Sequence, residues 1–337
     1  MIRDRILIDA IYLNSLGGLN LFKVFLNGIK NKSKYFVIVD DRFDLKQLKN
    51  VDYKVVSKNE VSRLIFYFFN RKKFSKIICF SNIPPPINAT KTFIYFQNHL
   101  LINKKGIRLP LKAKILLELK FLYIKFLNKK NYSWIVQTHS IKVEIQEKLH
   151  LKINNLYVFP FFKEIKQQKS KSNENIFIYP ANFLPHKNHE ILLSSFILAA
   201  NKISSKIEIK LTIEESKFYF LINKFAFIPP NLTITNLGQL NQDKMYKEYN
   251  KCKFLIFPSL KESFGLPLIE ATNIGLKVLA SNLSYVNEVV IPSLTFDPSS
   301  SNSICKVIIE STYMDLPPSK LKIKNRLLEL ITKIENV

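Results

Sequence analysis

Short apolar runs, rich in β-branched and aromatic residues, alternate along the chain with longer segments of helical periodicity. The run at 35–41, YFVIVDD, shows no regular polar alternation, which is typical of strands buried on both faces of a parallel sheet. The segment at 17–29 has large apolar residues at intervals of three and four, namely Phe22, Phe25, Leu26 and Ile29. This spacing predicts an amphipathic helix. Repetition of the two patterns predicts an α/β fold.

The same criteria predict the remaining elements. In the first half, strands are expected at 5–13, 35–41, 53–57, 76–82, 92–98 and 133–139, and helices at 17–29, 59–72, 110–130 and 140–150. In the second half, strands are expected at 175–182, 207–213, 232–239, 253–259, 277–282 and 294–298. Helices are expected there at 188–202, 215–226, 242–251, 266–275 and 284–289, and a last helix at 319–337.

A polar, lysine-rich segment without periodicity, 163–175, predicts a linker between the two series. A chain of 337 residues also exceeds what one core usually organises. We therefore expect two Rossmann-like, doubly wound domains facing a central cleft, at 1–165 and 166–320. A C-terminal helix at 321–337 follows, with packing back on the first domain as one option. Ligands of such sheets bind outside the carboxyl ends of the strands, so motifs at strand ends are the candidate sites.

The chain is strongly basic, with 51 Lys and Arg against 26 Asp and Glu and a formal net charge of +25. This balance favours an anionic partner, which is a nucleic acid, an acidic membrane surface or a phosphorylated substrate. Composition does not choose among the three.

Three cysteines, Cys79, Cys252 and Cys305, lie far apart and outside any CxxC or Cys/His cluster. Neither a disulfide framework nor a structural zinc site is expected. The start of the chain does not resemble a signal peptide, and no uninterrupted apolar stretch reaches the length of a membrane-spanning helix. A reduced, cytoplasmic setting is expected. Asp40 and Asp41 indicate a turn rather than a metal site.

The stretch at 259–272, SLKESFGLPLIEAT, predicts a strand end, a loop and a helix start. Gly265 permits an unusual φ, and Pro267 suits the first turn of a helix. We expect Glu270 in that first turn and Glu262 at the strand end, where carboxylates accept hydrogen bonds from sugar hydroxyls. Alternatively, Glu270 only favours the helix dipole and Glu262 is a solvated loop acid, and spacing alone leaves this open.

Lys187 lies where a strand turns into a helix, and a lysine there can neutralise a diphosphate. A solvated surface lysine is the alternative. Asn188 is the expected N-cap of the helix. Gly17 and Gly18 form a weak phosphate-loop candidate, since the segment is not GxGxxG, and a plain turn is the alternative.

His99 follows the strand at 92–98, and a histidine at a carboxyl end is a candidate polar catalytic group. His139 follows the next strand and competes for the same role. Near it, Thr138 or Ser140 is expected to cap the following helix.

The segment at 109–131 mixes apolar residues with six lysines: Lys112, Lys114, Lys120, Lys125, Lys129 and Lys130. A basic helix with a broad apolar side suits the surface of an anionic membrane. A helix packed on the sheet with its lysines reaching into water explains the pattern equally well.

Taken together, these motifs resemble those of the GT-B glycosyltransferases, specifically the large retaining group often called family 4. The main match is ESFGLPLIE at 262–270, an E-x7-E motif. PHKNHEILLSSF at 185–196, LGQLNQDKMYKEYNKCKFLIFPS at 237–259, SNLSYVNEVV at 281–290 and LTFDP at 294–298 add to it. Most of 176–298 is covered in order, whereas the N-terminal half agrees mainly by pattern.

This resemblance implies transfer of a sugar from a nucleotide-diphosphate donor with retention at the anomeric carbon. It implies catalytic roles for His99 and Glu262. It also implies that the donor is bound by Gly17, Gly18, Asn182, Lys187, Ser263, Phe264, Gly265, Leu266 and Glu270. Among these, Lys187 would meet the diphosphate and Glu270 the ribose. No metal and no cofactor besides the donor substrate are expected, in agreement with the missing D-x-D pair.

At one position the sequence departs from the family. Ala181 and Asn182 stand where the family often has Gly-Arg, so one phosphate-binding cation is missing or is supplied elsewhere.

The implied acceptor is a glycan or a polyprenyl-linked glycan in bacterial surface polysaccharide synthesis, such as O-antigen, capsule or lipopolysaccharide. The enzyme would be cytoplasmic, with contact to the inner membrane face through 109–131. Two alternatives stay open: a non-catalytic GT-B binding or assembly subunit, and a basic nucleic-acid-binding protein. No helix-turn-helix, RRM or KH signature is present, so a nucleic-acid partner is not expected.

Overall fold

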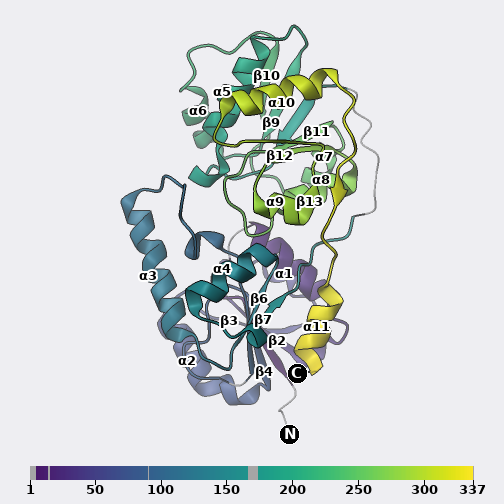
Figure 1. The fold of residues 1–337 in the computed structure, drawn as a ribbon. Helices are drawn as coiled ribbons and strands as arrows, with labels where there is room; N and C mark the ends of the chain where they lie inside the picture. The colour runs from purple at the N-terminus through teal and green to yellow at the C-terminus, as the bar shows by residue number, and fades with distance from the viewer. Residues whose placement is uncertain (1–4, 14–15, 90, 166–173, 337) are drawn as a thin grey trace. The chain divides into compact units, whose positions relative to one another are not determined.

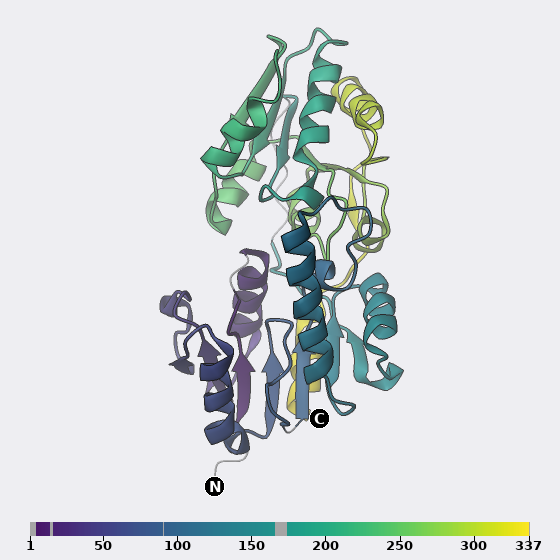
Figure 2. The ribbon, with the colours of Figure 1, turned by 90° about the vertical axis from the view of Figure 1, so that its left-hand side faces the viewer.

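The structure is a computed structural model and describes residues 5–13, 16–89, 91–165 and 174–336. The chain divides into two compact units. Unit 1 consists of Met1–Lys104, Pro110–Glu164 and Lys324–Val337. Unit 2 consists of Lys105–Leu109 and Ile165–Ile323. Figures 1 and 2 show the fold in two views.

Unit 1 contains a parallel sheet with the strand order β3-β2-β1-β4-β5-β6-β7. Its strands are β1 Ile6–Asp9, β2 Tyr35–Val39, β3 Asp52–Val55, β4 Lys76–Cys79, β5 Lys91–Tyr95, β6 Ser133–Val136 and β7 Leu156–Val158. Its α-helices are α1 Leu16–Gly28, α2 Glu60–Asn70, α3 Leu111–Leu127, α4 His139–Leu149 and α11 Leu327–Asn336.

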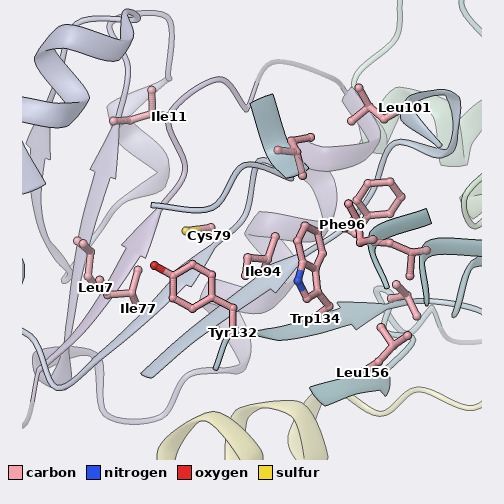
Figure 3. Close-up of a cluster of buried hydrophobic side chains, with 14 of the residues drawn as sticks. Leu7, Ile11, Ile77, Cys79, Ile94, Phe96, Leu101, Tyr132, Trp134 and Leu156 are labelled. Atoms are coloured by element: carbon pink, nitrogen blue, oxygen red, sulfur yellow. The ribbon is translucent and has the colours of Figure 1, made fainter. Parts of the chain in front are cut away.

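Both faces of this sheet are covered, as the unbroken apolar runs predicted. Leu7, Ile77 and Cys79 join the core cluster with residues of α2, α3 and α4 (Figure 3). Their strand neighbours point to the opposite face, because side chains of a strand alternate between the two sides. On that opposite face α1 packs against α11, where a Cβ on Gly28 would come within 2.6 Å of Leu327.

Unit 2 contains a second parallel sheet with the order β10-β9-β8-β11-β12-β14. Its strands are β8 Ile176–Tyr179, β9 Ile207–Leu211, β10 Leu232–Asn236, β11 Phe254–Phe257, β12 Lys277–Ser281 and β14 Leu294–Phe296. Its α-helices are α5 His189–Ala200, α6 Glu215–Ile222, α7 Gln242–Tyr249, α8 Leu266–Ile274, α9 Ser284–Val289 and α10 Ser301–Tyr313.

The two sheets share one winding scheme. In each, the first strand of the unit lies between the second and the fourth, which is the doubly wound order 3-2-1-4-5-6. The α/β class and the two parallel sheets are therefore confirmed. Strand β7 and helix α10 were not predicted.

The expected helix at 319–337 is wrong in its first part. Lys320–Leu321 forms strand β15, which pairs antiparallel with β13, Val290–Ile291. Lys322 continues this pairing by donating its backbone N–H to Val289 O at 2.9 Å. Helix α11 begins only at Leu327, after this paired segment. In the described part of the chain, none of the helices has the length and apolar character needed to cross a bilayer.

A fully buried ion pair lies in unit 1, between α2 and the end of β1. Arg63 Nε donates to Asp9 Oδ2 at 2.9 Å, and Tyr67 Oη donates to the same oxygen at 2.8 Å. Arg63 Nη2 also donates to Pro84 O at 2.9 Å, so one side chain joins α2 to the end of β1 and to the loop after β4. Burial raises the pKa of Tyr67, which keeps it a donor.

Removing only the cation of this pair should be costly, because Asp9 would then be a buried charge without its counterion. Arg63→Met is expected to lower the free energy of unfolding by about 3–5 kcal/mol in urea titrations of the full chain. The double variant Asp9→Asn/Arg63→Met should recover part of the loss, since an amide can still accept from Tyr67. Lys72→Met, an exposed charge near α2, is the control. A change below about 0.5 kcal/mol in Arg63→Met would contradict this prediction.

Candidate functional site

In unit 2 the strand order reverses between β8 and β11, and this is where doubly wound sheets bind ligands. β8 leads into the turn Pro185–Lys187 and then α5, and β11 leads through the loop at 258–265 into α8. The two strands are parallel neighbours, so their carboxyl ends meet at one edge. There Lys187 Nζ forms an ion pair with Glu262 Oε1. Both side chains are largely buried, with 16% and 13% of their surface exposed.

Backbone and side-chain hydrogen bonds hold the two loops together beneath this ion pair. Leu260 N donates to His186 O at 2.8 Å. Tyr179 Oη, at the end of β8, donates to Lys187 O at 2.8 Å and lies 2.8 Å from Ser259 Oγ. Since the phenol has one proton and gives it to Lys187 O, Ser259 donates to the phenol oxygen. The backbone of Lys187 is thereby fixed to the loop that carries Glu262.

Further buried donors support the same loop from β12 and α9. Ser281 Oγ donates to Ser259 O at 3.2 Å, and Tyr285 Oη donates to it at 2.7 Å. Burial, and then the charge of Glu262, raise the pKa values of Tyr179 and Tyr285. Both phenols therefore stay protonated and remain donors. These supporting residues were not found from the sequence, although buried hydroxyls at the ends of apolar strands are a usable signal.

Asn188 precedes α5 as expected, but its side chain does not cap the helix. Its backbone is left-handed, with φ 62° and ψ 32°, and no side-chain cap bond forms. The amide instead donates to Pro298 O at 2.7 Å and to Pro258 O at 3.3 Å. The capping prediction was wrong because a capping side chain usually requires an extended backbone. Asn188 ties three loops together instead.

His189 begins α5 and is almost fully buried between the rings of Tyr179 and Phe183, at centroid distances of 4.9 and 5.4 Å. Burial, followed by the nearby charge of Lys187, lowers the pKa of His189 to about 3. The imidazole of His189 is therefore neutral near pH 7, and the charge that faces Glu262 is that of Lys187.

Helix α8 begins directly after Gly265, whose φ of 77° is left-handed. A Cβ at this position would also come within 2.9 Å of Leu268 Cδ1, so two constraints favour glycine. The flanking residues differ in burial: Phe264 is buried, and Ser263 and Leu266 are half-buried. The first backbone N–H groups of a helix lack partners within the helix and can bind an anion.

Glu270 lies slightly further along α8 than predicted. The helix starts at Leu266 as predicted, and Glu270, its fifth residue, falls just past the first turn, which holds no acidic residue. Glu270 Oε2 accepts a hydrogen bond of 3.1 Å from Tyr249 Oη in α7. Burial and the charge of Glu270 raise the pKa of Tyr249, which therefore stays a donor. The alternative role for Glu270, stabilisation of the helix dipole, loses weight because that effect is confined to the first turn.

The place of the family's Gly-Arg pair holds no cation here. Ala181 is buried, and Asn182 is exposed in the turn after β8.

Asp40 in unit 1 has the hydrogen bonds of a turn residue. It accepts from Tyr12 N at 2.8 Å and from Arg42 Nη2 at 2.6 Å. Among the described residues, no group of three or more His, Cys, Asp or Glu is placed to hold a metal ion.

The remaining predicted residues belong to unit 1. Gly17 and Gly18 do not lie in a loop, because α1 already begins at Leu16 and includes both in its first turn. The loop expectation is therefore wrong for the two glycines. The preceding positions 14–15 fall outside the described residues.

His99 follows β5 and contacts a carboxylate that the sequence did not reveal. Its Nε2 lies 2.9 Å from Glu144 Oε2, and Asn103 Nδ2 donates to the same oxygen at 2.9 Å. Thr138 caps α4 by accepting from Ile141 N at 3.4 Å, and His139 is the first residue of that helix. The partner lies 45 residues away in sequence, which is why only the fold shows it.

The chain is similar in sequence to known glycosyltransferases. Residues 161–314 match the family model "Glycosyl transferases group 1". The uncharacterized glycosyltransferase MJ1178 of Methanocaldococcus jannaschii is 26% identical over 322 residues, or 92% of this chain and 89% of that protein. The serotype-specific mannosyltransferase WbdA of Escherichia coli is 31% identical over 111 residues, but this match spans 32% of the chain and 13% of WbdA.

Among solved structures, Anabaena Alr3699/HepE in complex with UDP-glucose superposes with a TM-score of 0.67. The sequence identity is 12%, and the match covers 98% of this chain and 95% of that one. A likeness at this identity concerns the fold, and that fold agrees with the two doubly wound sheets. By its family model, the segment 161–314 is a glycosyl transferases group 1 domain, and the architecture of the chain is the GT-B fold.

Proposed function

We propose that this glycosyltransferase moves a sugar, with retention and without a bound metal ion, from a nucleotide-diphosphate donor to a glycan or lipid-linked glycan. The observation that carries the proposal is the Lys187–Glu262 ion pair at the β8/β11 edge, beside the start of α8. At this edge, the lysine and the N-terminus of α8 suit the diphosphate of a donor molecule, and the carboxylate suits its sugar hydroxyls.

The leaving group sets the main electrostatic requirement. Breaking the glycosidic bond leaves negative charge on the diphosphate, and fixed positive groups must stabilise it. Lys187 supplies a full charge, and the backbone N–H groups around Phe264 to Leu266 supply partial charges at the helix start. A bound diphosphate would compete with Glu262 for Lys187, which would release the carboxylate to accept from the donor sugar. With Asn182 in place of the usual arginine, Lys187 carries a larger share of this task.

Glu270 is proposed to accept hydrogen bonds from the ribose, with Tyr249 fixing the position of its carboxylate. For unit 1 we propose that His99 serves the reacting centre and that Glu144 orients its ring. Both roles follow the family resemblance, with the hydrogen bonds of this chain as additional support.

The acceptor is proposed to belong to a bacterial surface polysaccharide. The match to a serotype-specific mannosyltransferase supports this, because serotypes are distinguished by surface antigens. The UDP-glucose complex of Anabaena Alr3699/HepE supports a nucleotide-sugar donor. A thermal-shift panel of UDP-, GDP-, ADP- and TDP-sugars would identify the nucleotide, since a ligand of the folded state raises the unfolding temperature.

Turnover with the donor found in that panel tests the roles of Glu262 and Lys187. Glu262→Gln keeps the shape of the side chain but removes its charge, and Lys187→Met removes the cation. Each is expected to lower kcat/KM for sugar transfer by about 100-fold or more. The matched control is Glu190→Gln, which removes the acid of the more exposed Lys224–Glu190 pair in the same unit and should leave turnover unchanged.

Unchanged turnover in Glu262→Gln would refute its assignment. If the parent protein binds a nucleotide sugar but transfers and hydrolyses none of the panel, the non-catalytic binding subunit is correct instead.

Ligand binding separates the roles of Glu262 and Glu270. Glu270→Gln should weaken binding of the nucleoside diphosphate and of the nucleotide sugar alike, by about 10- to 100-fold, because both contain the ribose. Glu262→Gln should weaken only the nucleotide sugar, since a nucleoside diphosphate lacks the transferred sugar. Titration calorimetry with both ligands measures the difference. Equal effects of the two variants on the nucleoside diphosphate would contradict the division of roles.

A further inference from the structure

Helix α3 has two apolar stripes on opposite sides. The inner stripe, Leu117, Phe121 and Ile124, packs against the core of unit 1. The outer stripe consists of large exposed side chains at intervals of three and four: Leu111, Ile115, Leu119, Leu122 and Phe126. Their exposed fractions run from 51% for Ile115 to 76% for Phe126. A packed surface helix normally has a polar outer side, so this second stripe is not explained by the fold.

Helix α2 repeats the arrangement. Its inner side, Arg63, Phe66 and Tyr67, is buried. Its outer side is apolar along its whole length, with Val61, Leu64, Ile65, Phe68 and Phe69. Phe68 and Phe69 are 67% and 70% exposed, and their rings contact each other edge to face at 5.2 Å.

The two outer sides share one side of unit 1. Phe66 of α2 and Ile124 of α3 belong to the same core cluster, so both helices cover the same face of the sheet, as Figures 1 and 2 show. Tyr123 Oη of α3 also donates to Glu60 Oε2 of α2 at 2.9 Å. Since both helices bury their inner sides against one sheet face, their outer stripes point away from it together. We call these outer stripes, with the neighbouring Leu116, the α2–α3 apolar face.

Basic residues border this face. Helix α3 carries four exposed lysines, Lys112, Lys114, Lys120 and Lys125. Its single acidic residue, Glu118, is paired with Lys104 at 2.9 Å. The turn Arg71–Lys73, directly after α2, adds three cations. Apolar side chains surrounded by cations are complementary to an anionic lipid surface, where acyl chains lie beneath phosphate groups.

Charge also separates this occupant from a second copy of the chain. An isologous dimer through this face would bring the same lysines of two protomers close together, with one paired glutamate per α3 to offset them. In an anionic bilayer, the same lysines would extend to the headgroups while the apolar stripes enter the acyl boundary.

We propose that the α2–α3 apolar face docks on the surface of an anionic lipid bilayer. Docking would hold unit 1 at the membrane, where a lipid-linked acceptor would be located. The inference goes beyond the proposed reaction and uses no residue of the Lys187–Glu262 site.

Vesicle flotation with the full chain tests this proposal. The probes are phosphatidylcholine vesicles with and without phosphatidylglycerol. The protein should float with the anionic vesicles, stay largely unbound with the neutral ones, and bind less as salt increases. The variant Ile65→Ser/Phe68→Ser/Leu119→Ser/Phe126→Ser should reduce the bound fraction at least tenfold. Phe227→Ser/Met314→Ser, two exposed apolar residues of unit 2, should not reduce it.

A charge-matched pair of variants tests the lysines. Lys112→Gln/Lys114→Gln/Lys120→Gln/Lys125→Gln should weaken binding to anionic vesicles strongly. A second variant with glutamine at four exposed lysines of unit 2, Lys206, Lys217, Lys306 and Lys320, loses the same net charge and should bind nearly as well as the parent. Far-UV circular dichroism and thermal midpoints verify that all variants are folded.

Three outcomes would overturn the proposal: no flotation with anionic vesicles, equal loss in the two lysine variants, or equal loss in the two apolar variants. A dimer that becomes monomeric in the α2–α3 serine variant, as measured by light scattering, would instead assign the face to a second copy.

Discussion

The candidate site depends on the hydrogen bonds that join the loop after β8 to the loop after β11. Tyr179, through its bond with Ser259, and Asn188 and Leu260 make these bonds across the point where the strand order of unit 2 reverses. A largely buried lysine and glutamate must overcome a substantial desolvation cost, and they do so only when their geometry is fixed in advance. The buried phenols of Tyr179 and Tyr285 hold the loop backbone in that geometry. The ion pair is thus a consequence of how two parallel strands end, and its chemistry follows from its position.

Much of this arrangement could be predicted from the sequence. Strands buried on both faces leave unbroken apolar runs, so the two βα series and the linker region stand out. The rule that ligands bind at the carboxyl ends of strands then selected Lys187 and Glu262, which the structure places in contact. The start of α8 at Leu266 was also predicted, but Glu270 was assigned to the first turn although it is the fifth residue of the helix and lies past that turn. Helix α10 was missed because serine and cysteine, Ser311 and Cys305, fill part of its buried side.

Partners that are distant in sequence were the least accessible to prediction. Nothing in the sequence around His99 indicates that Glu144, from helix α4, lies 2.9 Å from its ring. Asn188 shows the opposite problem, because the residue type and its place before a helix predict a cap. Its left-handed backbone directs the amide to two carbonyls in other loops instead. In both cases the decisive information is a tertiary contact, and local pattern describes only one of the two residues involved.

The basic composition alone could not identify the partner either, because a net positive charge favours three classes of anionic partner. In the structure, the individual cations can be distinguished by what surrounds them. Lys187 lies at a strand end against a carboxylate, which suits a small phosphorylated ligand. The lysines of α3 flank the apolar stripe from Leu111 to Phe126. A nucleic-acid backbone would gain little from such a stripe, because phosphate contacts need cations and polar donors rather than exposed aliphatic side chains. The inner and outer apolar stripes lie on opposite sides of α3, so the helix as a whole has no single apolar side. From the sequence alone, such a helix cannot be told from one that is packed on both sides. Its place in the fold shows that one stripe is buried and the other is exposed.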